Sequence, residues 1–95
     1  MHFDSRVIPI ELLHTFVCVA DSKSVTKAAK LLNITQPAVS LRIKRISAML
    51  GEELFVWKNG NFSLTNHGGV FYPLARRVVD NYFDVMSEYE RTLRS

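Results

Sequence analysis

Residues 24–51 decide the fold, and they read SVTKAAKLLNITQPAVSLRIKRISAMLG. Ser24 is a good N-cap for a short helix, because the apolar residues after it recur at helical spacing. These apolar residues are Val25, Ala28, Ala29 and Leu32. Asn33 tolerates a left-handed conformation and Thr35 supplies the next cap, so the connection is a turn of about three residues. A longer helix then covers residues 36–50 and ends at the glycine that follows.

One helix precedes this stretch, and a hairpin and a long helix follow it. Apolar residues at helical spacing over 10–20 predict the first helix. Asn59-Gly60 stands between the apolar runs 54–57 and 62–64, which is a strong signal for a two-stranded hairpin, or wing. Thr65 then caps a last helix that runs almost to the end of the chain. The fold class is therefore mostly α, a winged helix-turn-helix of three helices and a two-stranded wing followed by a long helix.

The last helix is longer than a domain of this size covers by itself. At about 1.5 Å per residue it measures roughly 40 Å. Its apolar residues step by three and four, and they are Phe71, Leu74, Val78, Tyr82, Val85, Met86, Tyr89 and Leu93. Pro73 lies within the helix, so we expect a kink or a frayed first turn near Gly68 and Gly69.

Charge is unevenly distributed along the 95 residues, although the net charge is only +3. No acid lies between Asp21 and Glu52. The basic residues of this window are Lys23, Lys27, Lys30, Arg42, Lys44 and Arg45. The chain after Thr65 is balanced. A basic block predicts a polyanionic partner, although the charges alone are equally compatible with a solvated helix face.

The helix over 36–50 has an apolar stripe and a polar outer face. The stripe consists of Val39, Ile43, Ile46 and Leu50, and the outer face of Pro37, Leu41, Lys44 and Ala48, flanked by Ser40 and Arg45. In a helix-turn-helix the second helix lies in the DNA major groove. Gln36 both accepts and donates, so it suits a two-point contact with adenine, while Pro37 and Leu41 offer apolar surface to a thymine methyl group. Thr35 and the first N–H groups of the helix suit a phosphate.

Five motifs in this order strongly resemble the N-terminal DNA-binding domain of LysR-type transcriptional regulators. They are the Ala28-Ala29 pair, Thr-Gln-Pro-Ala-x-Ser at 35–40, Leu50-Gly51, Leu54-Phe55 and Leu-Thr-x-x-Gly at 64–68. The resemblance covers about residues 10–94. It implies sequence-specific binding to double-stranded DNA, with the wing at the minor groove and the last helix paired with that of a second subunit. It also implies a bacterial regulator of transcription, and the single cysteine, Cys18, fits a reducing compartment, so we expect a cytoplasmic protein.

The residues and the resemblance together give two sets of candidate site residues. The DNA-binding set is Thr35, Gln36, Pro37, Ser40, Leu41, Arg42, Lys44, Arg45, Lys23, Lys27, Lys58 and Asn59. The homodimerisation set is Phe71, Leu74, Val78, Tyr82, Val85, Met86 and Tyr89. We expect a DNA-binding domain over 1–65 and a linker or dimerisation helix over 66–95. Because such regulators continue into an effector-binding domain, we expect the chain to be an excised domain.

The sequence departs from the family pattern in the helix over 36–50 and in the wing. Leu41 stands where a basic residue is common, and Ser47 where a glutamate is frequent. The wing lacks the usual arginine after Leu-Phe-acid, so Lys58 is its remaining charge, with asparagines as possible readers of the minor-groove edge. Trp57 either packs on a sugar or closes the small core, and we favour the core.

Other classes of function find less support. His2, His14 and His67 are scattered, and no glycine-rich loop precedes a helix with a phosphate-binding lysine, so an enzyme is not expected. A single cysteine, Cys18, excludes an internal disulfide and a cysteine-pair zinc site, so we expect no cofactor or metal. The alternative is a winged-helix module that binds protein through Leu41 and the last helix, which the basic window argues against.

Overall fold

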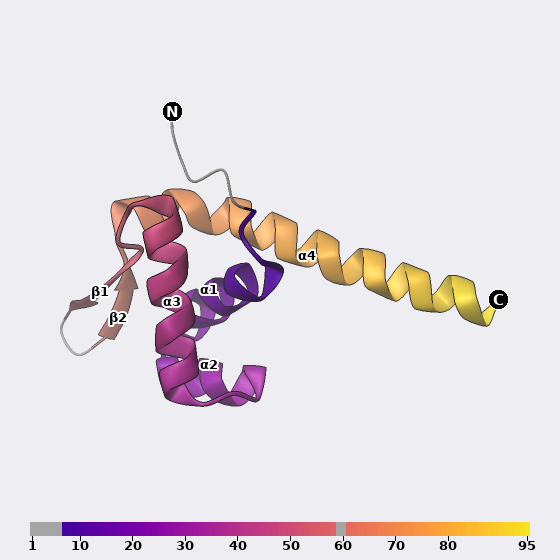
Figure 1. Cartoon of the computed structure of the whole chain (residues 1–95), viewed down its shortest axis with the longest axis horizontal. Coiled ribbons are helices and arrows are strands. Elements are labelled where there is room, and N and C mark those ends of the chain that lie inside the picture. The colour runs from indigo at the N-terminus through magenta and orange to yellow at the C-terminus, as the bar shows by residue number, and fades with distance from the viewer. Residues whose placement is uncertain (1–6, 59–60) are drawn as a thin grey trace.

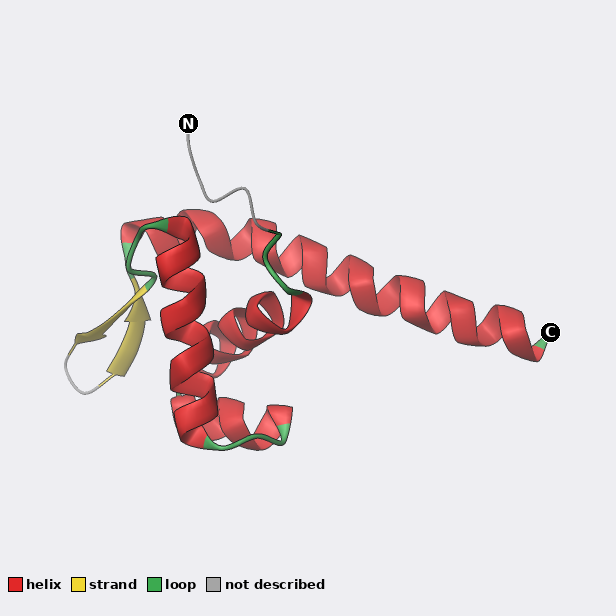
Figure 2. Ribbon diagram, in the orientation of Figure 1, coloured by secondary structure: helices red, strands yellow, loops and turns green. Residues whose placement is uncertain are grey.

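The computed structural model describes residues 7–58 and 61–95. Its elements follow the order of the sequence prediction (Figures 1 and 2). They are α1 (Ile10–Ser22), α2 (Val25–Leu32), α3 (Gln36–Leu50), β1 (Phe55–Lys58), β2 (Asn61–Leu64) and α4 (Asn66–Arg94). The fold class is confirmed, a winged helix-turn-helix followed by one long helix.

The predicted caps define α2, α3 and the turn between them. Ser24 Oγ accepts a hydrogen bond from the Lys27 N–H at 3.1 Å. Thr35 Oγ1 accepts one from the Ala38 N–H at 3.3 Å. Between the helices, Asn33 takes a left-handed conformation with φ 57°. Each of these caps satisfies one of the N–H groups that a helix start leaves unpaired, and together with Asn33 they define a short turn.

The core lies where α1 meets the other helices and the wing. Phe16 of α1 is fully buried, and its ring lies 5.3 Å from Phe55 of the wing and 5.2 Å from Phe71 of α4, centroid to centroid. On α3, the predicted stripe contributes two fully buried residues, Val39 and Ile46. The other two stripe residues, Ile43 and Leu50, are only half-buried. Ser47 is buried beside the stripe, and its Oγ has no partner among the described residues.

The wing is one antiparallel strand pair in which Phe55 faces Leu64 and Lys58 faces Asn61. Phe55 is buried, whereas Trp57 is 69% exposed. The preference for Trp57 as a core residue is therefore wrong. The physical reason is its position: Trp57 lies two residues beyond Phe55 on the same face of the strand pair, where it packs on Phe62 at 5.1 Å and borders an open hollow instead of the core.

Helix α4 begins at the Thr65 cap and is continuous to Arg94. Thr65 Oγ1 accepts from the Gly68 N–H at 3.1 Å and donates to the Glu53 carbonyl at 2.7 Å. The first turn is thus fixed, and the expected fraying is not found. Ala75 and Val79 are buried against the core, and every residue from Asp84 onward is exposed. The C-terminal half of α4 accordingly projects away from the other helices (Figure 1).

None of the helices in the described part of the chain combines the length and apolar character that crossing a bilayer requires.

Candidate nucleic-acid interface

The outer face of α3 carries most of the candidate DNA-binding residues. Val39 and Ile46 are fully buried, so the opposite side of the helix is turned to solvent. The exposed residues of the helix and its cap include Thr35, Gln36, Pro37, Ser40, Leu41, Lys44 and Arg45. Leu41 is 49% exposed and lies on this face beside Lys44 and Arg45. The face therefore offers hydrogen-bonding, apolar and cationic groups together.

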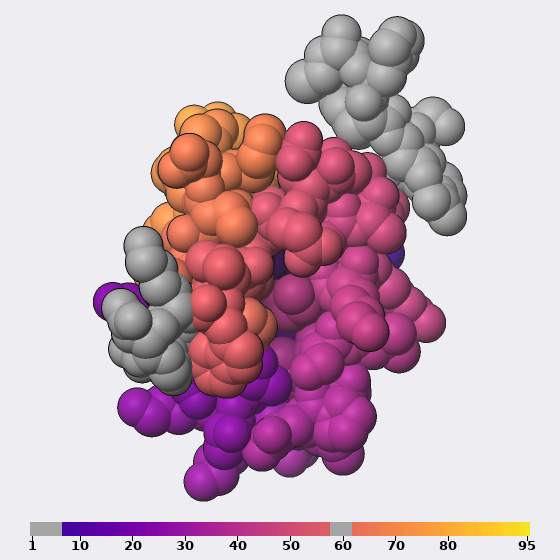
Figure 3. All heavy atoms as spheres, turned by 90° about the vertical axis from the view of Figure 1, so that its left-hand side faces the viewer, coloured from indigo at the N-terminus to yellow at the C-terminus, as the bar shows by residue number. Residues whose placement is uncertain are grey.

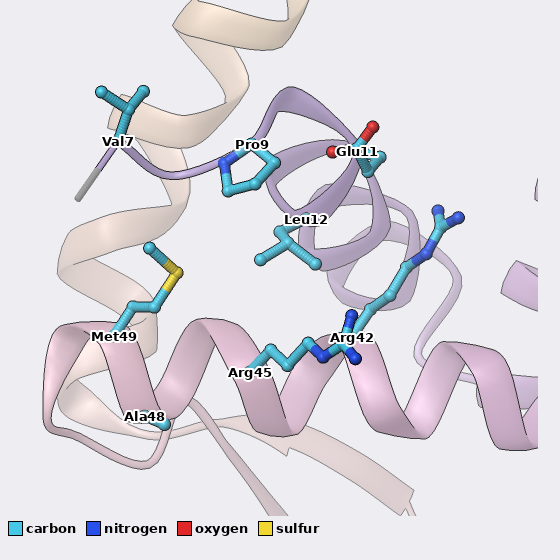
Figure 4. A pocket seen from close by; sticks show the side chains of 8 residues that line it. All are labelled: Val7, Pro9, Glu11, Leu12, Arg42, Arg45, Ala48 and Met49. Carbon is cyan, nitrogen blue, oxygen red and sulfur yellow. The ribbon is translucent and has the colours of Figure 1, made fainter.

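Arg42 lies on the flank of α3 that faces α1, apart from Gln36. It is half-buried, and its Nη1 donates to Thr15 Oγ1 at 3.3 Å. Arg42 and Arg45 line a hollow of about 600 Å³ beside the start of α1 (Figure 4). The other lining residues are Val7, Pro9, Glu11, Leu12, Ala48 and Met49. Two guanidinium groups over a largely apolar floor make this flank cationic.

The opposite flank of α3 faces the wing and the start of α2. Lys23, Lys27, Gln36 and Trp57 line one hollow of about 470 Å³ there. Figure 3 looks toward this side, with the wing in red and orange, α3 in magenta and the purple residues around the start of α2 below. The structure thus brings two candidate lysines next to the first residue of α3. Asn59 and the side chain of Lys58 lie outside the described residues.

His14 connects α1 to both α3 and α4. Its ring lies edge-on to Phe83 of α4, with 5.0 Å between the centroids. Burial lowers the pKa of His14, and the nearby Arg42 guanidinium lowers it further. The imidazole is therefore held toward its neutral form. Helical spacing alone could not reveal this contact, because Phe83 is 69 positions away in sequence and only the fold brings the two rings together.

A polar network fixes α4 against the end of α1. Arg76 Nη1 lies 3.0 Å from Asp21 Oδ2, and Arg76 Nε lies 3.3 Å from Asp80 Oδ2. The Tyr72 hydroxyl donates to Asp21 and accepts from Arg76. The hydrogen bond to Asp21 raises the pKa of Tyr72. Sequence reasoning missed this network; only the four-residue spacing of Arg76 and Asp80 signals any part of it.

The candidate dimerisation residues lie along α4 in two environments. Phe71 is half-buried and packs on Phe16 of the chain's own core. The remaining six are exposed large apolar or aromatic side chains: Leu74, Val78, Tyr82, Val85, Met86 and Tyr89. We call these six residues the α4 stripe. No other element of the described chain covers this long apolar row on the projecting helix.

Titratable clusters are sparse elsewhere in the described residues. No group of three or more His, Cys, Asp or Glu side chains among them is placed to hold a metal ion. Burial raises the pKa of the Cys18 thiol, and the neighbouring Asp21 carboxylate raises it further. His67 Nε2 lies 3.3 Å from Glu52 at the surface.

Comparisons with known proteins give one consistent answer. Residues 10–69 match the family described as bacterial regulatory helix-turn-helix protein, lysR family. The chain is 35% identical over 79 residues to the HTH-type transcriptional regulator CitR of Bacillus subtilis (strain 168), covering 83% of this chain and 27% of CitR. It thus spans about a quarter of the length of the curated relatives it matches.

Solved structures resemble it over nearly the whole chain. The BenM_DBD complex with catB site 1 DNA has a TM-score of 0.82 and 30% identity, covering 92% of this chain and 98% of that one. Corynebacterium glutamicum OxyR in its oxidized form has a TM-score of 0.86 and 26% identity, covering 90% of this chain and 28% of that one.

Proposed function

The chain belongs to the lysR family of bacterial regulatory helix-turn-helix proteins, and we propose that it binds double-stranded DNA in a sequence-specific manner, as the DNA-reading part of a transcriptional regulator. The observation that carries the proposal is the outer face of α3, which the buried Val39 and Ile46 turn toward solvent. The similar BenM_DBD structure is a DNA complex, which supports the same use of this fold. The function is binding in the bacterial cytoplasm, not catalysis.

Each part of α3 has a distinct role in the proposal. Gln36 reads a base edge in the major groove, because its amide both donates and accepts. Pro37 and Leu41 meet apolar groups such as a thymine methyl, while Thr35 and Ser40 offer hydroxyls. Lys44 and Arg45 contact phosphates on either side. Arg42 contributes its charge from the flank that faces α1.

The wing takes the minor groove beside the site of α3. Lys58 and Asn59 are the polar residues that we assign to this contact. Lys23 and Lys27, at the start of α2, contact the DNA backbone. These residues belong to a DNA-binding unit over 1–65.

The unit over 66–95 is a dimerisation helix. The α4 stripe supports this proposal, because it leaves apolar side chains exposed along a helix that projects beyond its own core. A second copy that packs antiparallel against it buries both stripes by the same contacts. Phe71, at the base of the stripe, contributes to this interface from its position on the core. A dimer presents two α3 helices, so it reads two half-sites.

A protein-binding module is the second candidate, because Leu41 is an exposed apolar residue at the centre of the α3 face. Lys44 weighs against it, since lysine is depleted in protein interfaces.

Selection of binding sites from random duplexes tests the proposal. We expect an enriched sequence with two related half-sites. Affinity for a labelled copy of that duplex, measured by fluorescence anisotropy, should fall steeply as salt rises, because several cations displace counterions. A scrambled duplex of the same composition is the control and should bind more weakly. If selection enriches nothing, or if affinity is independent of salt, the proposal is wrong.

A further inference from the structure

A row of aromatic rings leads from the core to the outer part of the wing. Phe16 contacts Phe55 at 5.3 Å, Phe55 contacts Phe62 at 5.1 Å, and Phe62 contacts Trp57 at 5.1 Å, centroid to centroid. The row ends in an indole that is 69% exposed. Because Phe62 packs on one side of this ring, Trp57 presents a large, partly immobilised aromatic surface to solvent.

The exposed indole of Trp57 borders a hollow that has cationic residues on its other side. Trp57 lines this hollow of about 470 Å³ together with Gln36 and residues 22–27. Lys23 and Lys27 supply the charges of that side, and Ser24 and Thr26 supply hydroxyls. No acid is among the residues that line the hollow in the described part of the chain. The hollow therefore combines positive charge, hydrogen-bonding groups and one aromatic face.

We propose that this hollow seats the sugar-phosphate backbone of one strand of the bound duplex, with the Trp57 indole packed on a deoxyribose. The inference rests on the proposed DNA binding and deepens it, because it names the residue that takes the place of a charged group in the wing. The indole N–H is a donor only, so it suits a phosphate oxygen, and its ring suits the apolar face of the sugar. Lys23 and Lys27 neutralise the phosphate on the opposite wall.

The position of Gln36 favours DNA over an acidic peptide as the ligand of this hollow. Gln36 lies at the start of α3 and lines the same hollow as Trp57. A strand that borders the major groove read by Gln36 has to leave the groove past this end of α3. It then enters the space between α2 and the wing. Since sugars and phosphates are alike in every sequence, Trp57 adds affinity without adding base preference.

Tryptophan fluorescence tests the contact directly, because Trp57 is the only tryptophan of the chain. The probe is the duplex obtained by site selection, and binding is followed separately by the anisotropy of a labelled duplex. We expect the bound protein to be quenched by acrylamide about twofold or more less efficiently than the free protein, since the sugar covers the indole. This readout uses the unmodified chain, so it does not depend on whether a variant folds.

Substitutions separate the contribution of the indole to DNA affinity from the contribution of the rest of the wing. Trp57→Ala should weaken binding about three- to tenfold for the selected and the scrambled duplex alike. Trp57→Phe should recover part of the loss. Val56→Ala is the matched control: Val56 is also exposed, but it lies on the opposite face of β1, so affinity should stay unchanged.

The outcomes distinguish this inference from the proposed function. If the duplex binds but Trp57 remains as accessible to acrylamide as before, the inference is overturned and the proposed function stands. The same holds if polyglutamate protects Trp57 and the duplex does not. If no duplex binds at all, both fail together. Protection by the duplex with a loss in Trp57→Ala that exceeds the loss in Val56→Ala supports the inference.

Discussion

Gln36 is the residue on which base reading depends in the proposed complex. It is exposed at the first position of α3, and its amide is free to turn toward a base edge. Gln36→Ala should cost about 1 to 3 kcal/mol on the selected duplex and little on a scrambled one, because a lost base contact matters only where the right base is present. Anisotropy titrations on both duplexes measure the two costs.

Lys44→Ala is the matched comparison on the same helix. Lys44 is exposed two turns farther along α3, and it is assigned to phosphate. Its loss should weaken both duplexes to the same extent and reduce the slope of log affinity against log salt by about 1. Equal losses on both duplexes for Gln36→Ala as well would show that Gln36 does not read bases.

His14 makes the stability of the fold depend on pH. Its pKa in the folded chain lies below 6.5, because burial and the Arg42 charge disfavour the protonated ring. As pH falls through 6.5, the unfolded chain takes up the proton before the folded chain does. The free energy of unfolding therefore decreases between pH 6.5 and the lower folded pKa.

Thermal unfolding at pH 7 and pH 5 checks this expectation. The melting temperature of the wild type should be lower at pH 5, and His14→Gln should show a smaller drop, because it removes the titrating ring. All other side chains are the same in both proteins, so the comparison isolates His14. An identical drop in the variant would remove His14 from the explanation.

At the scale of elements, the contact between α4 and the wing depends on one glycine. A Cβ added at Gly68 would lie 2.2 Å from the Leu54 carbonyl oxygen and 2.9 Å from Leu64 Cδ2. The Leu54 oxygen also accepts the Thr65 N–H at 3.0 Å, so the backbone there is held in place. Gly68→Ala should therefore destabilise the protein by about 1 to 3 kcal/mol, measured by urea unfolding.

The neighbouring glycine provides the control for that substitution. A Cβ at Gly69 meets nothing within 4 Å, and the residue lies within α4. Gly69→Ala should stabilise the protein by about 0.5 to 1 kcal/mol, because alanine loses less backbone entropy in a helix. A stability loss in both variants would point to the helix start and not to the close approach of Leu54.

The elements that the sequence predicted well are those determined by local bonds. Ser24, Thr35 and Thr65 each cap the helix expected from their position, because a cap needs only residues two or three positions away. Asn59-Gly60 likewise lies between the two observed strands. Each of these features is encoded within a few consecutive residues.

Features that depend on distant partners were missed or misjudged. The sequence favours Trp57 as a core residue, but its exposure depends on what lies opposite its face of the wing, which is an open hollow. Arg42 is on the predicted helix, yet its flank position follows from the way α3 packs on Thr15. The pairing of Asp21 with Arg76 joins residues that share no local pattern. Hydrophobic periodicity places a residue on a helix face but does not identify what lies opposite.

At the scale of the whole molecule, α4 connects the DNA-reading unit to the proposed dimer interface on the α4 stripe. The buried residues Ala75 and Val79 and the pairing of Asp21 with Arg76 fix its N-terminal half on α1. Beyond the contact of Phe83 with His14, its C-terminal half is exposed from Asp84 onward. The direction of α4 relative to α3 is therefore determined inside one chain, and in a dimer it determines the distance between the two α3 helices and so the spacing of the half-sites.

A carboxylate on the α4 stripe should separate the dimer. Val78 is 50% exposed and belongs to the stripe, so in the proposed dimer Val78→Glu buries an unpaired charge, and two-fold symmetry introduces the change twice. We expect the dimer to weaken by at least about 2 kcal/mol, roughly thirtyfold in its dissociation constant, by sedimentation equilibrium. Ser87→Glu adds the same charge to the opposite face of the same helix and should leave the dimer intact.

Because paired half-sites need paired chains, Val78→Glu should also bind a two-half-site duplex much more weakly than the wild type does. It should retain the affinity of one chain for one half-site. A wild-type protein that sediments as a monomer at all concentrations, or a Val78→Glu variant that dimerises as well as Ser87→Glu, would exclude the stripe as the interface.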